Sequence, residues 1–171
     1  MANHFSSITD EQAALIRNAS LFFVATADPQ LAKGANGLGP VNVSPKGGVP
    51  LHILGPNRVA FLDYSGSGNE TARHSIAGGP ITVMVCSFED GDAAIVRLYG
   101  KASVTPLADS PLAERFMEAK TAAHLAWPLR DIIEITVEST MTSCGYGVPV
   151  LAFVRDRGKE DRGRRYKAAR S

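Results

Sequence analysis

Cysteine is scarce in this 171-residue chain, which holds only Cys86 and Cys144. Two cysteines are too few for a disulfide framework, and their separation is not that of metal ligands. We therefore expect a reduced, cytoplasmic protein. No apolar run approaches the roughly 20 residues that a membrane-spanning helix needs. The first residues also lack a basic segment followed by an apolar stretch, so a secretory signal is not expected.

Three common binding signatures are missing as well. The chain has no Gly-x-x-x-x-Gly-Lys-Ser/Thr loop, and Gly66-Ser-Gly68 lacks the third glycine and the strand–helix–strand context of a dinucleotide fingerprint. None of the four histidines pairs with another histidine or a carboxylate at a zinc-like spacing. The sequence therefore disfavours P-loop, Rossmann and metal-centre functions.

Charge is nearly balanced overall but unevenly distributed. Hydrophobic residues make up 44% of the chain and charged residues 20%, values typical of one globular domain. Residues 155–171 hold eight Lys or Arg against three Asp or Glu, whereas residues 1–154 have an excess of acidic residues. We expect a folded domain over 1–154 and a basic tail over 155–171. A solvated tail and a nucleic-acid contact both remain open, although a nucleic-acid module would carry a basic face on its folded body.

The apolar pattern predicts strands that are joined mainly by turns. Helices are expected at residues 9–18, where Thr9 and Gln12 form a capping box, at 70–76 and at 110–126. Strands are expected at 21–27, 41–44, 50–54, 58–63, 81–88, 94–104 and 132–138, with a hairpin turn at 45–48. Turn connections favour an antiparallel sheet or barrel over a doubly wound fold, so the predicted class is mainly β with peripheral helices.

The segment Phe61–His74 is the most informative part of the chain. Small and hydroxyl residues follow a predicted strand and precede a predicted helix that carries Arg73. Backbone N–H groups at a helix start, hydroxyls and an arginine can together hold a phosphate. Tyr64 adds an aromatic ring beside them, which suggests a phosphorylated, ring-bearing ligand. Ordinary turn chemistry explains the same Ser, Gly and Asn residues equally well.

Two further segments could contact a ligand. Alternation places Asn42 and Ser44 on one face of a strand that ends at Lys46, although a hairpin with a solvent-facing lysine explains them too. The segment Thr142–Pro149 sets two glycines around Tyr146, which permits close backbone approach to a flat group. Cys144 lacks an assignable catalytic partner, so a structural or ligand-adjacent thiol is favoured over a nucleophile.

Five segments, taken in order, resemble those of a known family. They are Phe22–Thr26, Val41–Gly47, Phe61–His74, Arg97–Lys101 and Thr142–Pro149. Over roughly residues 5–150 the chain looks like the pyridoxamine 5′-phosphate oxidase-like family of FMN-binding split barrels. The resemblance implies a six-stranded antiparallel split β-barrel that forms a homodimer, with FMN at the subunit interface.

The resemblance also implies three groups of cofactor contacts. The flavin ring edge would be lined by Asn42, Val43 and Ser44, with Lys46 near the ring or the phosphate. The ribityl phosphate would lie along Tyr64 and Ser65 and be held by Asn69, Thr71 and Arg73, with His74 a weaker candidate. The turn of Cys144, Gly145 and Tyr146 would approach the flavin, from the second subunit.

The activity that the resemblance implies is an FMN-dependent oxidoreductase acting on an unidentified small molecule. The basic and aromatic residues that hold the substrate phosphate in true pyridoxamine phosphate oxidases cannot be assigned to this C-terminus, so pyridoxamine or pyridoxine phosphate is not the expected substrate. A non-catalytic flavin- or haem-binding sensor or carrier is the alternative. Haem or deazaflavin could replace FMN, with His52 and His74 as possible haem ligands.

Overall fold

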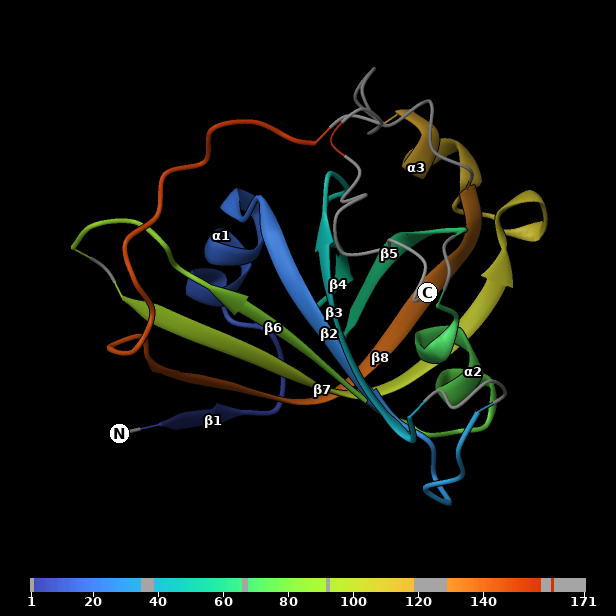
Figure 1. Ribbon diagram of the computed structural model, residues 1–171. Helices are drawn as coiled ribbons and strands as arrows, with labels where there is room; N and C mark the ends of the chain where they lie inside the picture. Colours follow the sequence, from blue (N-terminus) through green and yellow to red (C-terminus); the bar gives the residue numbers. More distant parts are fainter. Residues whose placement is uncertain are drawn as a thin grey trace, which may run out of the picture.

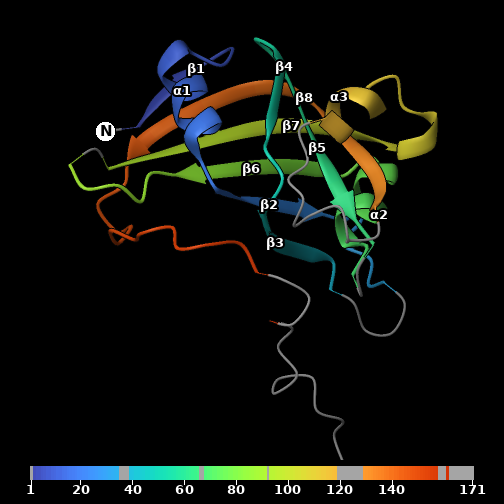
Figure 2. The same cartoon turned by 90° about the horizontal axis from the view of Figure 1, so that it is seen from above.

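The computed structural model describes residues 2–34, 39–65, 68–91, 93–118, 129–157 and 161. The strands are β1 (Asn3–Phe5), β2 (Leu21–Ala27), β3 (Val41–Gly47), β4 (His52–Gly55), β5 (Arg58–Tyr64), β6 (Pro80–Cys86), β7 (Ala94–Pro106) and β8 (Leu129–Cys144). The helices are α1 (Asp10–Asn18), α2 (Glu70–Ile76), the 3-10 turn η2 (Leu107–Asp109) and α3 (Ala113–Glu118). Figures 1 and 2 show α1 near one end of the sheet and α2 near the other.

The strands form one antiparallel sheet that curls around the core without closing. Its order is β3-β2-β6-β7-β8-β5-β4, and β1 pairs with β8 off this path. The predicted mainly β class and the split-barrel form are therefore confirmed. The predicted number of six strands is wrong, because the described sheet has eight. The three-residue β1 was missed, since so short a strand carries no readable alternation.

The predicted hairpin at residues 45–48 is also wrong. β3 continues through Pro45 to Gly47 and pairs with β2, whereas β4 pairs with β5. β3 and β4 therefore lie at opposite ends of the strand order although they are neighbours in the chain. Proline is tolerated within β3 because an edge strand does not need every N–H group for pairing. The chain leaves β3 at Gly48, whose φ of 74° suits glycine.

The core lies inside the curl of the sheet and joins its two ends. The rings of Phe22 from β2 and Phe61 from β5 meet edge to face with centroids 5.4 Å apart. Cys86 on β6 is also buried. A tight turn brings α2 against β2: a Cβ atom at Gly79 would lie 2.0 Å from the carbonyl oxygen of Ala27. The end of α2 is thereby held against β2.

The three predicted helices are present, although residues 110–112, predicted as helical, precede the start of α3. Thr9 and Gln12 make both hydrogen bonds of the capping box, and α2 spans Glu70–Ile76 as expected. The helix predicted at 110–126 is seen as α3, and its part beyond residue 118 lies outside the described residues. None of the helices in the described part of the chain has the length and apolar character needed to span a bilayer. Most of the basic tail also falls outside the described residues.

Candidate functional site

A polar pocket of about 260 Å³ lies where the split sheet fails to close. It is bounded by β3 from one end of the strand order, by β5 and β8 from the other, and by the start of α2. We call it the seam pocket. Its lining residues are Asn42, Ser44, Lys46, Asp63, Tyr64, Gly68, Asn69, Glu70, Thr71 and Arg130. The structure thus brings six of the twelve predicted site residues together, from the two segments Val41–Gly47 and Phe61–His74.

An ion cluster ties the two ends of the sheet together across this pocket. The Nζ atom of Lys46 on β3 lies 2.7 Å from Oδ1 of Asp63 on β5. Arg130 on β8 pairs with the second oxygen of Asp63, and its Nε lies 2.9 Å from Oδ2 of Asp131. Only 4% of the Asp63 side chain is exposed, so solvent screens its ion pairs little. The ammonium group of Lys46 also sits 5.6 Å from the ring centroid of Phe61.

Uncharged polar groups line the other side of the seam pocket. The side-chain amide of Asn42 donates to the hydroxyl of Thr71 over 3.3 Å. The Ser44 hydroxyl is buried and has no hydrogen-bond partner within the described part of the chain. A buried hydroxyl without a partner is costly. This group is therefore suited to a hydrogen bond with a ligand.

Tyr64 separates the seam pocket from a larger groove. The groove, of about 1400 Å³, is lined by α1, by the ends of β6 and β7 and by the segment after β8, and Tyr64 faces both spaces. Burial, and then the negative charge of Asp156, raises the pKa of Tyr64 from its ordinary 10.0 to about 12. The phenol therefore stays protonated over the physiological range and can donate a hydrogen bond to a ligand in either space.

The raised pKa of Tyr64 predicts a late step in a spectroscopic titration. We expect a phenolate absorbance change near pH 12 in the folded protein, which Tyr64→Phe removes and Tyr146→Phe leaves in place. Because the folded state holds this proton at pH values where the unfolded chain loses it, folding stability should fall as pH rises from about 10 toward 12. Loss of the late step in the Tyr146 variant instead would refute the assignment.

Arg73 does not line the seam pocket, and its guanidinium is held by three protein groups. It donates to Asp28 Oδ2 over 3.4 Å, to the Gly39 carbonyl over 3.2 Å and to Nε2 of His74 over 2.8 Å. Backbone N–H groups of Ala32 and Gln30 lower the pKa of Asp28, so this partner is a carboxylate. Its Nε–H is a further donor, which is buried and finds no acceptor among the described residues.

His74 is fully buried behind Arg73 and is held in one tautomer. Since the arginine can only donate, Nε2 of His74 accepts, and its Nδ1–H must donate to the Thr26 hydroxyl, 2.9 Å away. Burial, and then the positive charge of Arg73, lowers the pKa of His74. The neutral ring fixes Arg73 and has no free nitrogen for a haem iron. His52 also has a lowered pKa, caused by burial and then by Arg115.

The other predicted site residues lie away from the seam pocket within one chain. Val43 points to the outer face of β3 and is 64% exposed, and Ser65 follows β5 outside the pocket lining. Cys144 ends β8 and pairs with Ala94, far along the strand from Arg130. The Gly145 N–H donates to the Ala93 carbonyl over 3.1 Å, and Tyr146 is almost fully exposed. A single copy of the chain does not bring this turn to the pocket.

Sequence reasoning missed three charged residues of the seam pocket. Asp63 carried a signal, because an acidic residue inside the apolar segment Arg58–Tyr64 needs a charged partner. Glu70 was treated only as the first residue of a helix. Arg130 lies 67 positions after Asp63 in the sequence, and the pairing of β5 with β8 brings it to the pocket.

The fold and the site together define an antiparallel split barrel with a polar pocket at its seam. The family model for pyridoxamine 5′-phosphate oxidase matches residues 8–144. The chain belongs to the pyridoxamine 5′-phosphate oxidase family. It is 34% identical over 155 residues to the pyridoxamine 5′-phosphate oxidase family protein ustO of Aspergillus flavus, covering 89% of this chain and 58% of that protein. The chain thus spans little more than half the length of this curated relative.

Two solved structures share the fold. An FMN-binding protein from Syntrophomonas wolfei has a TM-score of 0.57 and 14% identity, over 83% of this chain and 84% of that one. HupZ from Group A Streptococcus has a TM-score of 0.55 and 20% identity, over 77% of this chain and 90% of that one. At these identities the likeness concerns the fold alone.

Proposed function

We propose that this protein binds FMN at the seam pocket and is an FMN-dependent oxidoreductase of the cytoplasm that acts on a small molecule. The observation that carries the proposal is that Ser44 Oγ and Arg73 Nε, on the two segments assigned to the ring edge and the phosphate, are among the buried polar groups without a hydrogen-bond partner in the described part of the chain. The family membership and the FMN-binding protein of the same fold support it. Both cysteines are unpaired, which suits a reducing compartment.

The residues present fit the polar parts of FMN. Asn42, the backbone of Val43 and Ser44 would hold the polar edge of the ring, while Lys46 supplies a positive charge beside it. The phosphate would be held by the hydroxyls of Ser65 and Thr71, the amide of Asn69 and the free Nε–H of Arg73. Tyr64 would lie along the chain between ring and phosphate. The bound flavin would supply the hydride or electron transfer, and the protein would orient its substrate and exclude water.

The size of the seam pocket leads us to propose a homodimer. Cofactor sites usually have volumes of roughly 300–1,000 Å³, and the seam pocket has about 260 Å³. The outer face of β3 beside it exposes Val41 and Val43, which suits a covered surface. A second copy packed there would enlarge the site and could contribute its own Cys144–Tyr146 turn to the flavin. Sedimentation of the purified protein tests this: a monomer at micromolar concentration contradicts the proposal.

The function itself is tested by the absorption spectrum of the purified protein, before and after denaturation and with added FMN. We expect a two-banded flavin spectrum and release of FMN on unfolding, followed by bleaching with NADH or NADPH and recovery in air. A haem Soret band, or a colourless protein that ignores FMN, would overturn the cofactor assignment. A bound flavin that no reductant bleaches would contradict the oxidoreductase activity and favour a carrier.

A further inference from the structure

Every charge at the β5–β8 side of the seam pocket is already paired. The pocket lining contains two cations, Lys46 and Arg130, and two carboxylates, Asp63 and Glu70, so its formal charge is zero. Asp63 accepts from both cations, one on each oxygen. Arg130 also contacts Asp131, outside the lining. Both cations of the lining therefore already have a carboxylate partner, which offsets much of the charge that an incoming anion would meet.

Because the ion cluster is largely buried, its ion pairs strongly affect the binding of an anion. The side chains of Lys46 and Arg130 are 17% and 22% exposed, and that of Asp63 is 4% exposed. Charges so poorly solvated interact over several ångströms with little screening. An anion brought beside Lys46 and Arg130 would meet the Asp63 carboxylate at short range. The repulsion by Asp63 would therefore cancel part of the attraction that the two cations exert on the anion.

We propose that Asp63 determines substrate charge: together with Asp131 it offsets the charges of Lys46 and Arg130, so that this side of the seam pocket accepts a neutral hydrogen-bonding group and rejects a phosphate group. The inference rests on the proposed function, because it takes the substrate to approach the bound flavin from this side. The substrate class is a small molecule whose docking group is an amide, carbonyl or alcohol. The ring of Phe61 under Lys46 and the unpartnered Ser44 hydroxyl suit such a group. The phosphate of the cofactor would lie at the opposite side, at the start of α2.

The test is a titration of the FMN-loaded protein with inorganic phosphate at constant ionic strength, followed by the flavin difference spectrum and the phosphorus-31 linewidth. The wild-type protein should show no saturable phosphate binding up to about 10 mM. Asp63→Asn keeps the size and hydrogen-bonding groups of the side chain but leaves one positive charge uncompensated. This variant should show saturable phosphate binding with a Kd that is roughly tenfold or more below that limit.

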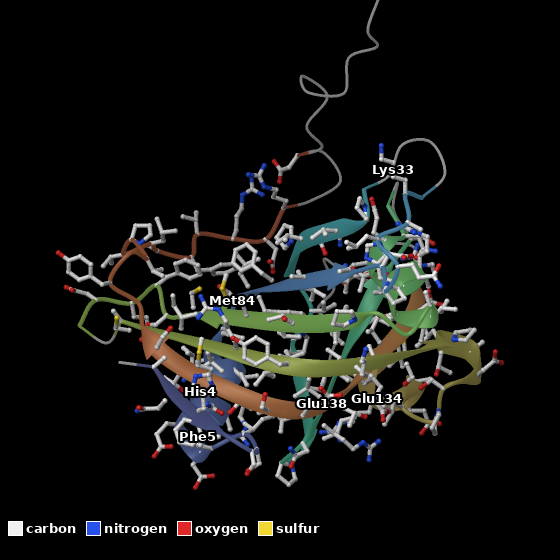
Figure 3. The ribbon with its side chains drawn as sticks, turned by 90° about the horizontal axis from the view of Figure 1, so that it is seen from below. His4, Phe5, Lys33, Met84, Glu134 and Glu138 are labelled. Carbon is white, nitrogen blue, oxygen red and sulfur yellow. The ribbon has the colours of Figure 1, made fainter. Side chains whose placement is uncertain are left out.

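Two matched variants separate this local effect from a general gain of charge. Lys46→Met/Asp63→Asn restores the neutral count and should return phosphate binding to the wild-type level. Glu134→Gln changes net charge by the same amount as Asp63→Asn, but Glu134, on β8 (Figure 3), is not part of the pocket lining and pairs with Arg58. It should behave as wild type. Equal gains in Asp63→Asn and Glu134→Gln, or no gain in Asp63→Asn, would overturn the proposal.

If thermal unfolding shows that Asp63→Asn does not fold, wild-type protein and Lys46→Met still decide the question. Saturable phosphate binding that Lys46→Met removes would overturn the proposal, and its absence supports it. The flavin spectrum of each sample reports cofactor loading separately. A wild-type protein that takes up no FMN refutes the proposed function, while the same titration on the ligand-free protein, read by phosphorus-31 linewidth and by its dependence on Lys46, still tests the role of Asp63.

Discussion

Replacing Arg73 by alanine should weaken FMN binding much more than riboflavin binding. The two ligands differ only in the phosphate, so their affinity ratio isolates the contacts that the phosphate makes. A lost charge-assisted hydrogen bond costs about 1.5–3 kcal/mol, or roughly 10- to 150-fold in affinity. Arg73 is suited to this role because Asp28, Gly39 and His74 already fix its guanidinium, which leaves the buried Nε–H as a prepositioned donor.

The ratio is the informative quantity, because the same substitution also disturbs the fold. It leaves the buried His74 ring without its donor and Asp28 without its cation, so a lower melting temperature is expected as well. Arg58→Ala is the matched control: it removes an arginine paired to a carboxylate, Glu134, at an exposed position. We expect this control to leave both affinities unchanged. Equal losses of FMN and riboflavin in Arg73→Ala would show that Arg73 only supports the structure.

The parts of the fold that were predictable from the sequence depend on local signals. The capping box of α1 and the bounds of α2 follow from residues within a few positions of each other. The strand at Leu21–Ala27 was predicted with its observed bounds because a short apolar run between polar turns has one simple interpretation. The pairing of β6 with β7 followed from the short loop between them. In each case the deciding interaction spans few residues.

The parts that were not predictable depend on which distant strands meet. The turn-like residues Pro45–Gly48 suggested a hairpin, but the hydrogen bonds of β2 compete for the same strand and extend it through Gly47. The same pairing, together with that of β5 and β8, sets Lys46, Asp63 and Arg130 around one pocket. No local pattern in a single sequence links positions so far apart. The sequence therefore predicted which segments line the candidate site, but not the ion pairs that join those segments.

Removing the carboxylate of Asp63 should be among the most destabilising changes in the described part of the chain. Asp63→Ala leaves Lys46 and the Asp63-facing side of Arg130 unpaired in a poorly solvated pocket. Breaking a buried ion pair from one side costs about 3–5 kcal/mol. Because the cluster joins β3 to β5 and β8, the loss should also loosen the seam between the two ends of the sheet. Urea unfolding of Asp63→Ala against wild type measures the cost.

A double-mutant cycle separates the ion pairs from simple packing. Lys46→Met/Asp63→Leu replaces a charged pair by apolar side chains and leaves Arg130 paired with Asp131. Since the cost of one-sided removal comes mainly from the charge left behind, this double variant should be more stable than Asp63→Leu alone and should recover at least half of that loss, with Lys46→Met alone as the fourth member of the cycle. Additive losses would instead mean that Asp63 and Lys46 act independently. In that case the seam is held by the Phe22–Phe61 contact and the surrounding core, and the cluster serves the pocket alone.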